Sequence, residues 1–316
     1  MDGTVGIVAG QIIVMFMVLA VGFVLYRVKF LTDEGTAQMS DLVLYVANPV
    51  LIAQALMREF DMQILVGAAW TALLAAIVLA IAAALGIAAY RGGSAHWQIG
   101  RFSVAFSNAG FIGIPLAYAT LGADGVFYIS VANAVQTALV WSWGVWLASG
   151  DKRECSVKKV VTSPAIIGMV VGLVCFLASW EPPELVTQAL DDLADLNTGL
   201  VMLVLGAHLG KCDLKELLRS AELYKASLLR LVVMPLLTTL MLCVLVIAFG
   251  AGAPSVDVLL AMVMYQGMPV AAVASLFAHK YGRDGDFGAG AVALTTLLSL
   301  VTLPCVMGVA TALLGA

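Results

Sequence analysis

Two short segments combine side-chain amides with glycine and proline inside otherwise apolar sequence. They are SNAGFIGIP at 107–115 and YQGMP at 265–269. Proline lacks an N–H and clashes with the carbonyl four residues earlier, so each segment is expected to break a helix near its middle. Helix ends exposed by such breaks carry a partial positive charge at their N-termini, which can bind an anion without any lysine or arginine. The residues predicted to shape the breaks are Gly110, Gly113, Pro115, Gly267 and Pro269.

Six amide side chains are the candidate ligands of such an anion. Asn108 and Gln266, within the two broken segments, are predicted to bond the substrate directly. The other four lie in apolar stretches and are predicted to line the same uncharged cavity: Asn48, Asn133, Gln136 and Asn197. For any one of these four, hydrogen bonding between helices without ligand contact is an equally good interpretation. Proline and glycine also kink ordinary membrane helices, but two such segments with adjacent amides favour a binding site.

The composition indicates the environment in which these segments lie. Of the 316 residues, 62% are hydrophobic and 11% are charged. A soluble domain would carry about 25% charged residues. The chain is therefore predicted to be an all-α integral protein of the cell membrane, inner or plasma. Its net charge of -4 gives no indication of nucleic-acid binding.

Apolar stretches long enough to cross a bilayer predict ten transmembrane helices. A hydrocarbon core about 30 Å thick needs roughly 20 apolar residues per helix. The predicted spans are 5–26, 40–57, 64–89, 100–121, 125–148, 164–180, 193–210, 226–250, 257–278 and 287–314.

The basic residues orient these spans. Fourteen of the sixteen lysines and arginines lie in or next to the loops after spans 1, 3, 5, 7 and 9. They are Arg27, Lys29, Arg91, Arg101, Lys152, Arg153, Lys158, Lys159, Lys211, Lys215, Arg219, Lys225, Lys280 and Arg283. The positive-inside rule makes these loops cytoplasmic and puts both termini on the non-cytoplasmic side.

The loop after span 5 divides the chain into two halves of five spans each. The predicted units are residues 1–149, a cytoplasmic linker at 150–163, and residues 164–316. An odd number of spans inverts the second half relative to the first, as in transporters built from inverted repeats. Spans 4 and 9, which hold Pro115 and Pro269, are then equivalent and are predicted to cross antiparallel at the membrane centre.

Ionisable residues inside the predicted spans are few. Arg230 is the only basic residue well inside a span; it could snorkel to the cytoplasmic surface, or act in gating or substrate entry. His208 is the only histidine inside a span and could couple protons or only bond a neighbouring helix. No carboxylate lies deep in a span, and no hydrolase, nucleotide-binding or metal motif is present, so neither an enzyme nor a bound cofactor is predicted.

Four motifs, in order along the chain, resemble those of the auxin efflux carrier family. They are LYVANP at 44–49, SNAGFIGIP at 107–115, LRLVVMP at 229–235 and the segment around Pro269. The resemblance implies ten spans in two inverted repeats, a scaffold of spans 1, 2, 6 and 7, and crossing helices 4 and 9. Asn108 and Pro115 match the first crossover and Pro269 the second, while Asn48 and Asn197 match the lining of helices 2 and 7. Bacterial members are often described as malonate or malate permeases, which implies a small carboxylate.

The sequence therefore predicts a secondary transporter for a small organic anion, a mono- or dicarboxylate, working by alternating access. An anion channel would use the same broken helices, and a membrane sensor without transport is the third class. The sequence leaves open whether H⁺ or Na⁺ is coupled to transport. The resemblance also implies that the chain can form a homodimer through its scaffold helices.

Overall fold

The computed structural model describes residues 2–92, 96–212 and 219–314, and the regular elements in these ranges are helices. Lys215, one of the basic residues counted above, lies outside the described residues. The α-helices are α1 (Asp2–Arg27), α2 (Asp33–Leu42), α3 (Asn48–Gln54), α4 (Met62–Ala89), α5 (Trp97–Ala105), α6 (Ile114–Leu139), α7 (Val145–Ser149), α8 (Val157–Val161), α9 (Pro164–Leu177), α10 (Glu184–Lys211), α12 (Ala221–Leu228), α13 (Met234–Phe249), α14 (Val256–Gly267), α15 (Val273–Lys280) and α16 (Gly285–Leu314). The π-helical turns η1 (Val43–Ala47), η2 (Ala109–Gly113), η3 (Val140–Gly144) and η5 (Leu229–Val233) join several of them, and η4 (Lys152–Glu154) and η6 (Gly250–Gly252) are 3₁₀ turns.

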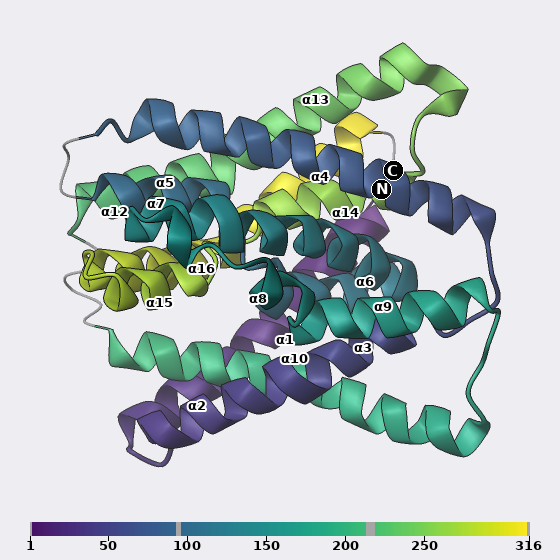
Figure 1. Cartoon of the computed structure of the whole chain (residues 1–316), viewed down its shortest axis with the longest axis horizontal. Coiled ribbons are helices and arrows are strands. Elements are labelled where there is room, and N and C mark those ends of the chain that lie inside the picture. The colour runs from purple at the N-terminus through teal and green to yellow at the C-terminus, as the bar shows by residue number, and fades with distance from the viewer. Residues whose placement is uncertain (1, 93–95, 213–218, 315–316) are drawn as a thin grey trace.

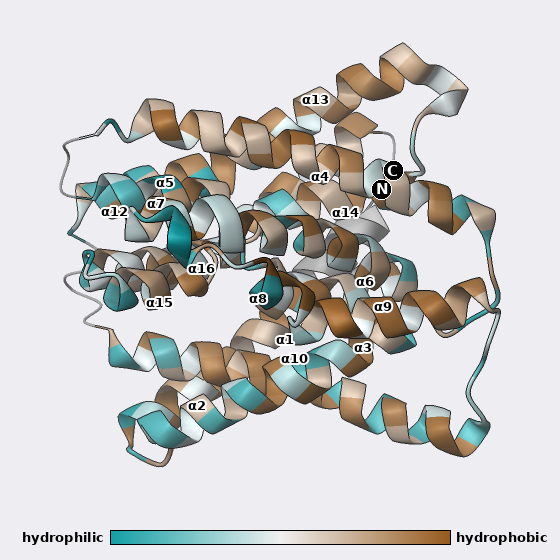
Figure 2. Ribbon diagram, viewed as in Figure 1, coloured by the Kyte–Doolittle hydropathy of each residue, from teal (hydrophilic) through white to brown (hydrophobic). Residues whose placement is uncertain are grey.

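Seven helical stretches of the described residues are long and apolar enough to cross a membrane. They are Gly10–Arg27, Met62–Ala89, Ala109–Ser149, Lys152–Leu177, Glu184–Lys211, Ala221–Gly252 and Gly285–Leu314. Large apolar side chains such as Ile247 and Val301 point outward from them, and Figure 2 shows hydrophobic residues along α4, α9 and α13. Such a surface matches lipid tails rather than water. The prediction of an all-helical, multi-pass membrane protein is confirmed.

The longest of these stretches is divided by Gly122. Ala109–Ser149 has 41 residues, which as one straight helix would be about 60 Å long, twice the hydrocarbon thickness. Gly122 has φ 66° and ψ −153°, a conformation that only glycine adopts without strain, and it turns the chain between two helical pieces inside α6. An ion pair of 2.5 Å between Arg58 and Asp124 links this turn to the α3–α4 connection.

Three of the π-helical turns have the same cause. Pro49, Pro115 and Pro235 each stand two residues after such a turn, at the start of α3, α6 and α13. The proline ring clashes with the carbonyl four residues earlier in a regular α-helix. In each case the residue before the proline donates its N–H to the carbonyl five residues earlier, so this turn of the helix contains one extra residue. At Pro49 and Pro235 the helix continues through this wide turn, whereas at Pro115 the chain opens just before it.

The helices form two groups with the two broken segments between them. Figure 1 shows α2, α3 and α10 in the lower half and α4, α5, α12 and α13 in the upper half, with α6 and α16 between; α1 runs diagonally from the N-terminus in the upper half to α10 in the lower half. Glycines allow the lower helices to touch backbone to backbone. A Cβ on Gly206 of α10 would overlap the backbone of Leu19 and Phe23 on α1, and one on Gly168 of α9 would overlap the backbone of Pro49 on α3. Small residues at such contacts are how membrane helices pack closely.

Candidate functional site

The two broken segments meet each other in the interior of the protein. Residues 106–108 separate α5 from η2, and residues 268–272 separate α14 from α15. The Asn108 N–H donates to the Pro269 carbonyl at 2.8 Å, and the Ala271 N–H donates to the Phe106 carbonyl at 3.0 Å. These bonds make an isolated antiparallel bridge between Ser107 and Val270. We call residues 106–108 and 268–272 together the crossover.

Gln136 of α6 holds the first crossover segment. Its Nε2 donates to the Ser107 carbonyl at 2.8 Å, and its Oε1 accepts from the Ser107 N–H at 2.8 Å. The same oxygen accepts from the Tyr265 hydroxyl at 3.0 Å. The side chain is 5% exposed, and its hydrogen-bonding groups are used by the protein itself.

Thr295 of α16 has the corresponding role on the second segment. Its hydroxyl oxygen accepts from the Val270 N–H at 3.1 Å and donates back to the Ala291 carbonyl at 2.6 Å. The extended backbone at Val270 therefore keeps a hydrogen-bond partner although it has left the helix. Each broken segment is thus supported by a polar side chain from the long helix that packs against it.

Arg230 occupies the other side of the crossover, where α5 and α14 end. Its Nε donates to the Met268 carbonyl at 3.0 Å, and its Nη1 donates to the Val104 carbonyl at 3.1 Å. Nη2 donates at 3.4 Å to the Tyr265 carbonyl, the group that loses its helical partner because Pro269 has no N–H. The expectation that Arg230 snorkels to the surface is wrong, because its side chain is 0% exposed. Its pairing with backbone carbonyls was not predicted from the sequence.

The N-terminal ends of two helices also face the crossover. The turn η2 begins at Ala109, α15 begins at Val273, and neither start has a side-chain cap. The first N–H groups of a helix have no partner within it, so both ends present donors and a partial positive charge. Asn108 is only 4% exposed, and its Nδ2 has no hydrogen-bond partner among the described residues. A buried donor beside two helix N-termini is suited to a carboxylate.

Two further predicted amides lie beside this N-terminal end. Asn48 of α3 donates from Nδ2 to the Gly110 carbonyl at 3.3 Å, and its Oδ1 has no described partner. The side chain of Asn133 faces the same glycine, because a Cβ built on Gly110 would lie 3.6 Å from Asn133 Nδ2. Asn48, Asn108 and Asn133 are therefore brought together around the start of η2.

Gln266 and Asn197 are fully buried, and both amide atoms of each lack a partner among the described residues. Gln266 is the penultimate residue of α14, directly before the crossover. Asn197 lies in the middle of α10 rather than at the start of its span, because α10 already begins at Glu184. No described contact joins Asn197 to the crossover.

The predicted glycines and prolines have distinct surroundings. Pro115 is buried in the first turn of α6, and Pro269 is buried within the crossover. A Cβ on Gly113 would touch Ile129 at 3.4 Å and Met268 at 3.6 Å, so this glycine faces the second segment. Gly267, the last residue of α14, faces Leu303 of α16.

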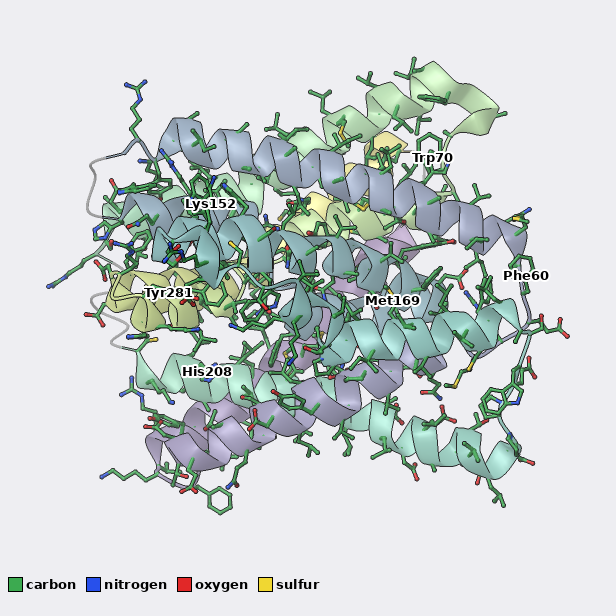
Figure 3. The ribbon with its side chains drawn as sticks, viewed as in Figure 1. Phe60, Trp70, Lys152, Met169, His208 and Tyr281 are labelled. Carbon is green, nitrogen blue, oxygen red and sulfur yellow. The ribbon has the colours of Figure 1, made fainter. Side chains whose placement is uncertain are left out.

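A cavity of about 850 Å³ leads toward the crossover between α10 on one side and α15 and α16 on the other. Ala272, at the start of α15, and Thr296 of α16 are among its walls, and all three histidines of the chain line it: His96, His208 and His279. None of the six predicted amides is a lining residue. Figure 3 places His208 in the same half of the molecule as Lys152 and Tyr281, while Phe60 and Trp70 lie in the other half.

The charges around this cavity are largely paired. Lys211 forms an ion pair of 2.6 Å with Asp33, and His96 Nδ1 lies 2.9 Å from a carboxylate oxygen of Asp284. The hydrogen bond from Lys211, together with one from Tyr26, lowers the pKa of the Asp33 carboxyl below its ordinary value. Lys211 is thus already matched by a carboxylate and adds no net positive charge to the cavity.

Comparisons with known proteins agree with these features. A protein of Methanothermobacter thermautotrophicus named "Uncharacterized transporter" is 27% identical over 300 residues, which are 92% of this chain and 94% of that protein. A protein of Rhizobium meliloti named "Putative malonate transporter" is 22% identical over 313 residues, 94% of this chain and 93% of that protein. The sequence model of a family described as "Membrane transport protein" matches residues 7–307. The chain therefore belongs to this family, the auxin efflux carriers, and is a membrane transporter rather than an enzyme.

Proposed function

We propose that this protein is a secondary transporter that carries a small organic anion, a mono- or dicarboxylate, across the cell membrane by alternating access. The observation that carries the proposal is the antiparallel pairing of Asn108 with Pro269, which brings two uncapped helix N-termini into the protein interior. Broken helices at membrane depth occur where they are buried in protein or line a substrate path.

The proposed architecture has ten spans in two inverted five-helix repeats, residues 1–149 and 164–316, joined by a cytoplasmic linker at 150–163. Two correspondences between the halves support it. Gln136 and Thr295 hold equivalent broken segments, and α1 packs on α10 as α9 packs on α3. The proposed orientation puts both termini outside and the end of the molecule that carries Lys152 in the cytoplasm.

The proposed substrate site is the space at the start of η2 and α15. Asn108 is assigned as the principal side-chain ligand, because its Nδ2 is a buried donor with no described partner. Asn48 and Asn133 complete the side of the site around Gly110. Gln266 and Asn197 are assigned as residues that bind the substrate or a coupled ion in a different conformation of the transport cycle, because both amide atoms of each have no described hydrogen-bond partner.

The cavity supports alternating access. The cavity of about 850 Å³ is lined by His208 and His279, and a second, much smaller pocket of about 10 Å³ with mainly apolar walls shares Leu205 and Thr296 with it. A path open from one end and closed at the other is what an inward-facing transporter requires. We propose that α1, α2, α3, α9 and α10 are a fixed scaffold and that the other helices move against it.

A small dicarboxylate is the first substrate to test, because one relative carries the name of a malonate transporter. Purified protein in proteoliposomes loaded with unlabelled malonate should accumulate external labelled malonate by exchange, and the rate should saturate. Pyruvate and succinate test the wider carboxylate class. A current through single open pores without saturable exchange would show a channel, and no flux of any carboxylate would contradict the proposal.

Asn108→Ala is the variant that tests the site. Because Asn108 Nδ2 has no partner to lose, the variant should keep its thermal unfolding temperature within a few degrees, whereas carboxylate exchange should fall by about tenfold or more, as expected for loss of a hydrogen bond to a charged group. Gln188→Ala, which removes an exposed amide on α10 outside the proposed site, is the control variant. Unchanged exchange by Asn108→Ala would remove Asn108 from the site.

Exchange measured with imposed proton and sodium gradients determines coupling. If H⁺ is coupled, uptake should rise with an inward proton gradient and fall in His208→Gln, whose side chain lines the cavity. If Na⁺ is coupled, uptake should need external sodium instead. A uniporter would respond to neither gradient beyond the effect on membrane potential.

A further inference from the structure

Arg230 is a buried cation with no carboxylate partner among the described residues. It takes part in none of the four ion pairs that these residues form. A guanidinium remains protonated in proteins, and a buried charge without compensation is strongly destabilising. The compensation must therefore come from the three backbone carbonyls, of Val104, Tyr265 and Met268, to which Arg230 donates.

These carbonyls belong to the C-terminal ends of two helices. Val104 is in the last turn of α5, Tyr265 is in the last turn of α14, and Met268 is the C-cap of α14. A helix C-terminus is equivalent to roughly half a negative charge, so two of them together amount to about one. The single positive charge of Arg230 balances that amount.

The N-terminal ends at the same crossover have no such fixed partner. The starts of η2 and α15 together amount to about one positive charge. Asn108 Nδ2 beside them is a buried donor with no described acceptor. Lys211 on the cavity wall is paired with Asp33. The two carboxylates of that wall, Asp284 and Asp286, lie at the start of α16 rather than in the crossover. The crossover is thus short of about one negative charge.

We propose that Arg230 is the fixed countercharge of the two helix C-termini and that it thereby sets the charge of the transported anion to one. The substrate is then a monocarboxylate, or a dicarboxylate with one carboxyl protonated. The inference rests on the proposed transport function and specifies its substrate class. Arg230 does not touch the substrate. It is a positioning residue whose positive charge neutralises the partial negative charge of the two helix C-termini, so that they do not repel an anion in the site.

Arginine variants test the countercharge. Arg230→Gln leaves the two C-termini uncompensated, so the half-saturation concentration for pyruvate exchange should rise by about tenfold or more. Arg230→Lys keeps the charge and should recover most of that loss. Arg283→Gln is the matched control, because Arg283 also donates to the last carbonyls of a helix, those of Ala148 and Ser149 in α7, but away from the crossover. Wild-type half-saturation in Arg230→Gln, or equal losses in the Gln and Lys variants, would overturn the proposal.

The unmodified protein provides a second test that does not depend on whether the variants fold. As pH falls through the second dissociation of malonate, half-saturation expressed as the singly charged form should stay constant, while half-saturation expressed as total malonate falls. Pyruvate, which keeps one charge over that range, reports any effect of His96, His208, His279, Asp284 or Asp286 on the cavity wall. Half-saturation that follows the doubly charged form, after this correction, would exclude a single-charge site.

The two proposals fail in different ways. If the unmodified protein exchanges no carboxylate at any pH, the proposed function is wrong. If it exchanges carboxylates but shows the doubly charged dependence, or is indifferent to Arg230→Gln, only the role of Arg230 and the single-charge limit are wrong.

Discussion

Gln136 and Gln266 are both buried amides at the crossover, but they differ in what they bond. Gln136 completes the hydrogen bonds of Ser107 and of the Tyr265 hydroxyl, whereas both amide atoms of Gln266 lack a described partner. Replacing Gln136 leaves buried polar groups of the protein without a hydrogen-bond partner, and their removal from water then costs free energy that nothing offsets. Replacing Gln266 breaks no described hydrogen bond and removes a buried polar group that itself had no partner. The two residue types are the same, yet their substitution should have opposite consequences.

Leucine substitutions at these two positions make a matched pair. Gln136→Leu should lower the stability of the solubilised protein by about 2–4 kcal/mol, because the Ser107 N–H and carbonyl are left unpaired. Gln266→Leu should leave stability unchanged or raise it, and should abolish the stabilisation by added carboxylate if Gln266 binds substrate. Thermal unfolding in detergent, with and without carboxylate, measures both. Equal destabilisation by the two substitutions would contradict this difference.

At the scale of elements, the close contact between α1 and α10 depends on single glycines. A Cβ on Gly206 would overlap the α1 backbone, whereas one on Gly199, two turns earlier on α10, would meet nothing within 4 Å. Gly206→Ala should therefore destabilise the protein by about 1–3 kcal/mol through overpacking. Gly199→Ala should be neutral or stabilising by up to about 1 kcal/mol, since alanine is the better helix former. The unfolding temperatures of the two variants test this difference. An unchanged unfolding temperature in Gly206→Ala would show that α1 and α10 can move apart without loss of stability.

The positions of the breaks could be predicted from the sequence, but their mutual contact could not. Pro115 and Pro269 act through their own covalent structure, so their effect on a helix is local and visible in the residues. The bond between Asn108 and the Pro269 carbonyl depends on how helices far apart in sequence are placed. The position of Arg230 depends on packing in the same way: it follows Lys225 by little more than one helical turn, which suggests the membrane surface, but its side chain contacts the ends of α5 and α14 in the interior.

At the scale of the whole molecule, composition alone determined the class of protein, while the span count depends on short or divided helices. Length and apolarity identify seven stretches, because Ala109–Ser149 forms one continuous run and Val256–Gly267 is short. The proposed ten spans follow only if Gly122 reverses the chain and if both broken helices cross together. The sequence identifies the amides as candidate ligands. It does not show which of them form hydrogen bonds within the protein, as Gln136 does with Ser107, because that depends on tertiary packing.

Accessibility of single cysteines tests the ten-span topology. Cysteines at Lys152 and Lys280 should react only from the cytoplasmic side, and cysteines at Glu181 and Ala251 only from the outside, because all four positions are exposed at helix connections. The background is a variant in which the five native free cysteines are replaced. Labelling of intact cells with a membrane-impermeant maleimide, before and after lysis, gives the assignment. Lys152 and Ala251 reacting from the same side would exclude the proposed topology.

The pairing of Phe106 with Ala271 and of Asn108 with Pro269 also has a consequence for biosynthesis. When residues 106–108 leave the ribosome, their partners and Arg230 have not yet been made. Unsatisfied backbone groups in lipid cost several kcal/mol each, so the first break cannot rest stably in the bilayer until the last third of the chain arrives. We therefore expect nascent chains that end before residue 230 to depend most on the insertion machinery and to be degraded fastest, and the finished protein to lock both halves together in one late step.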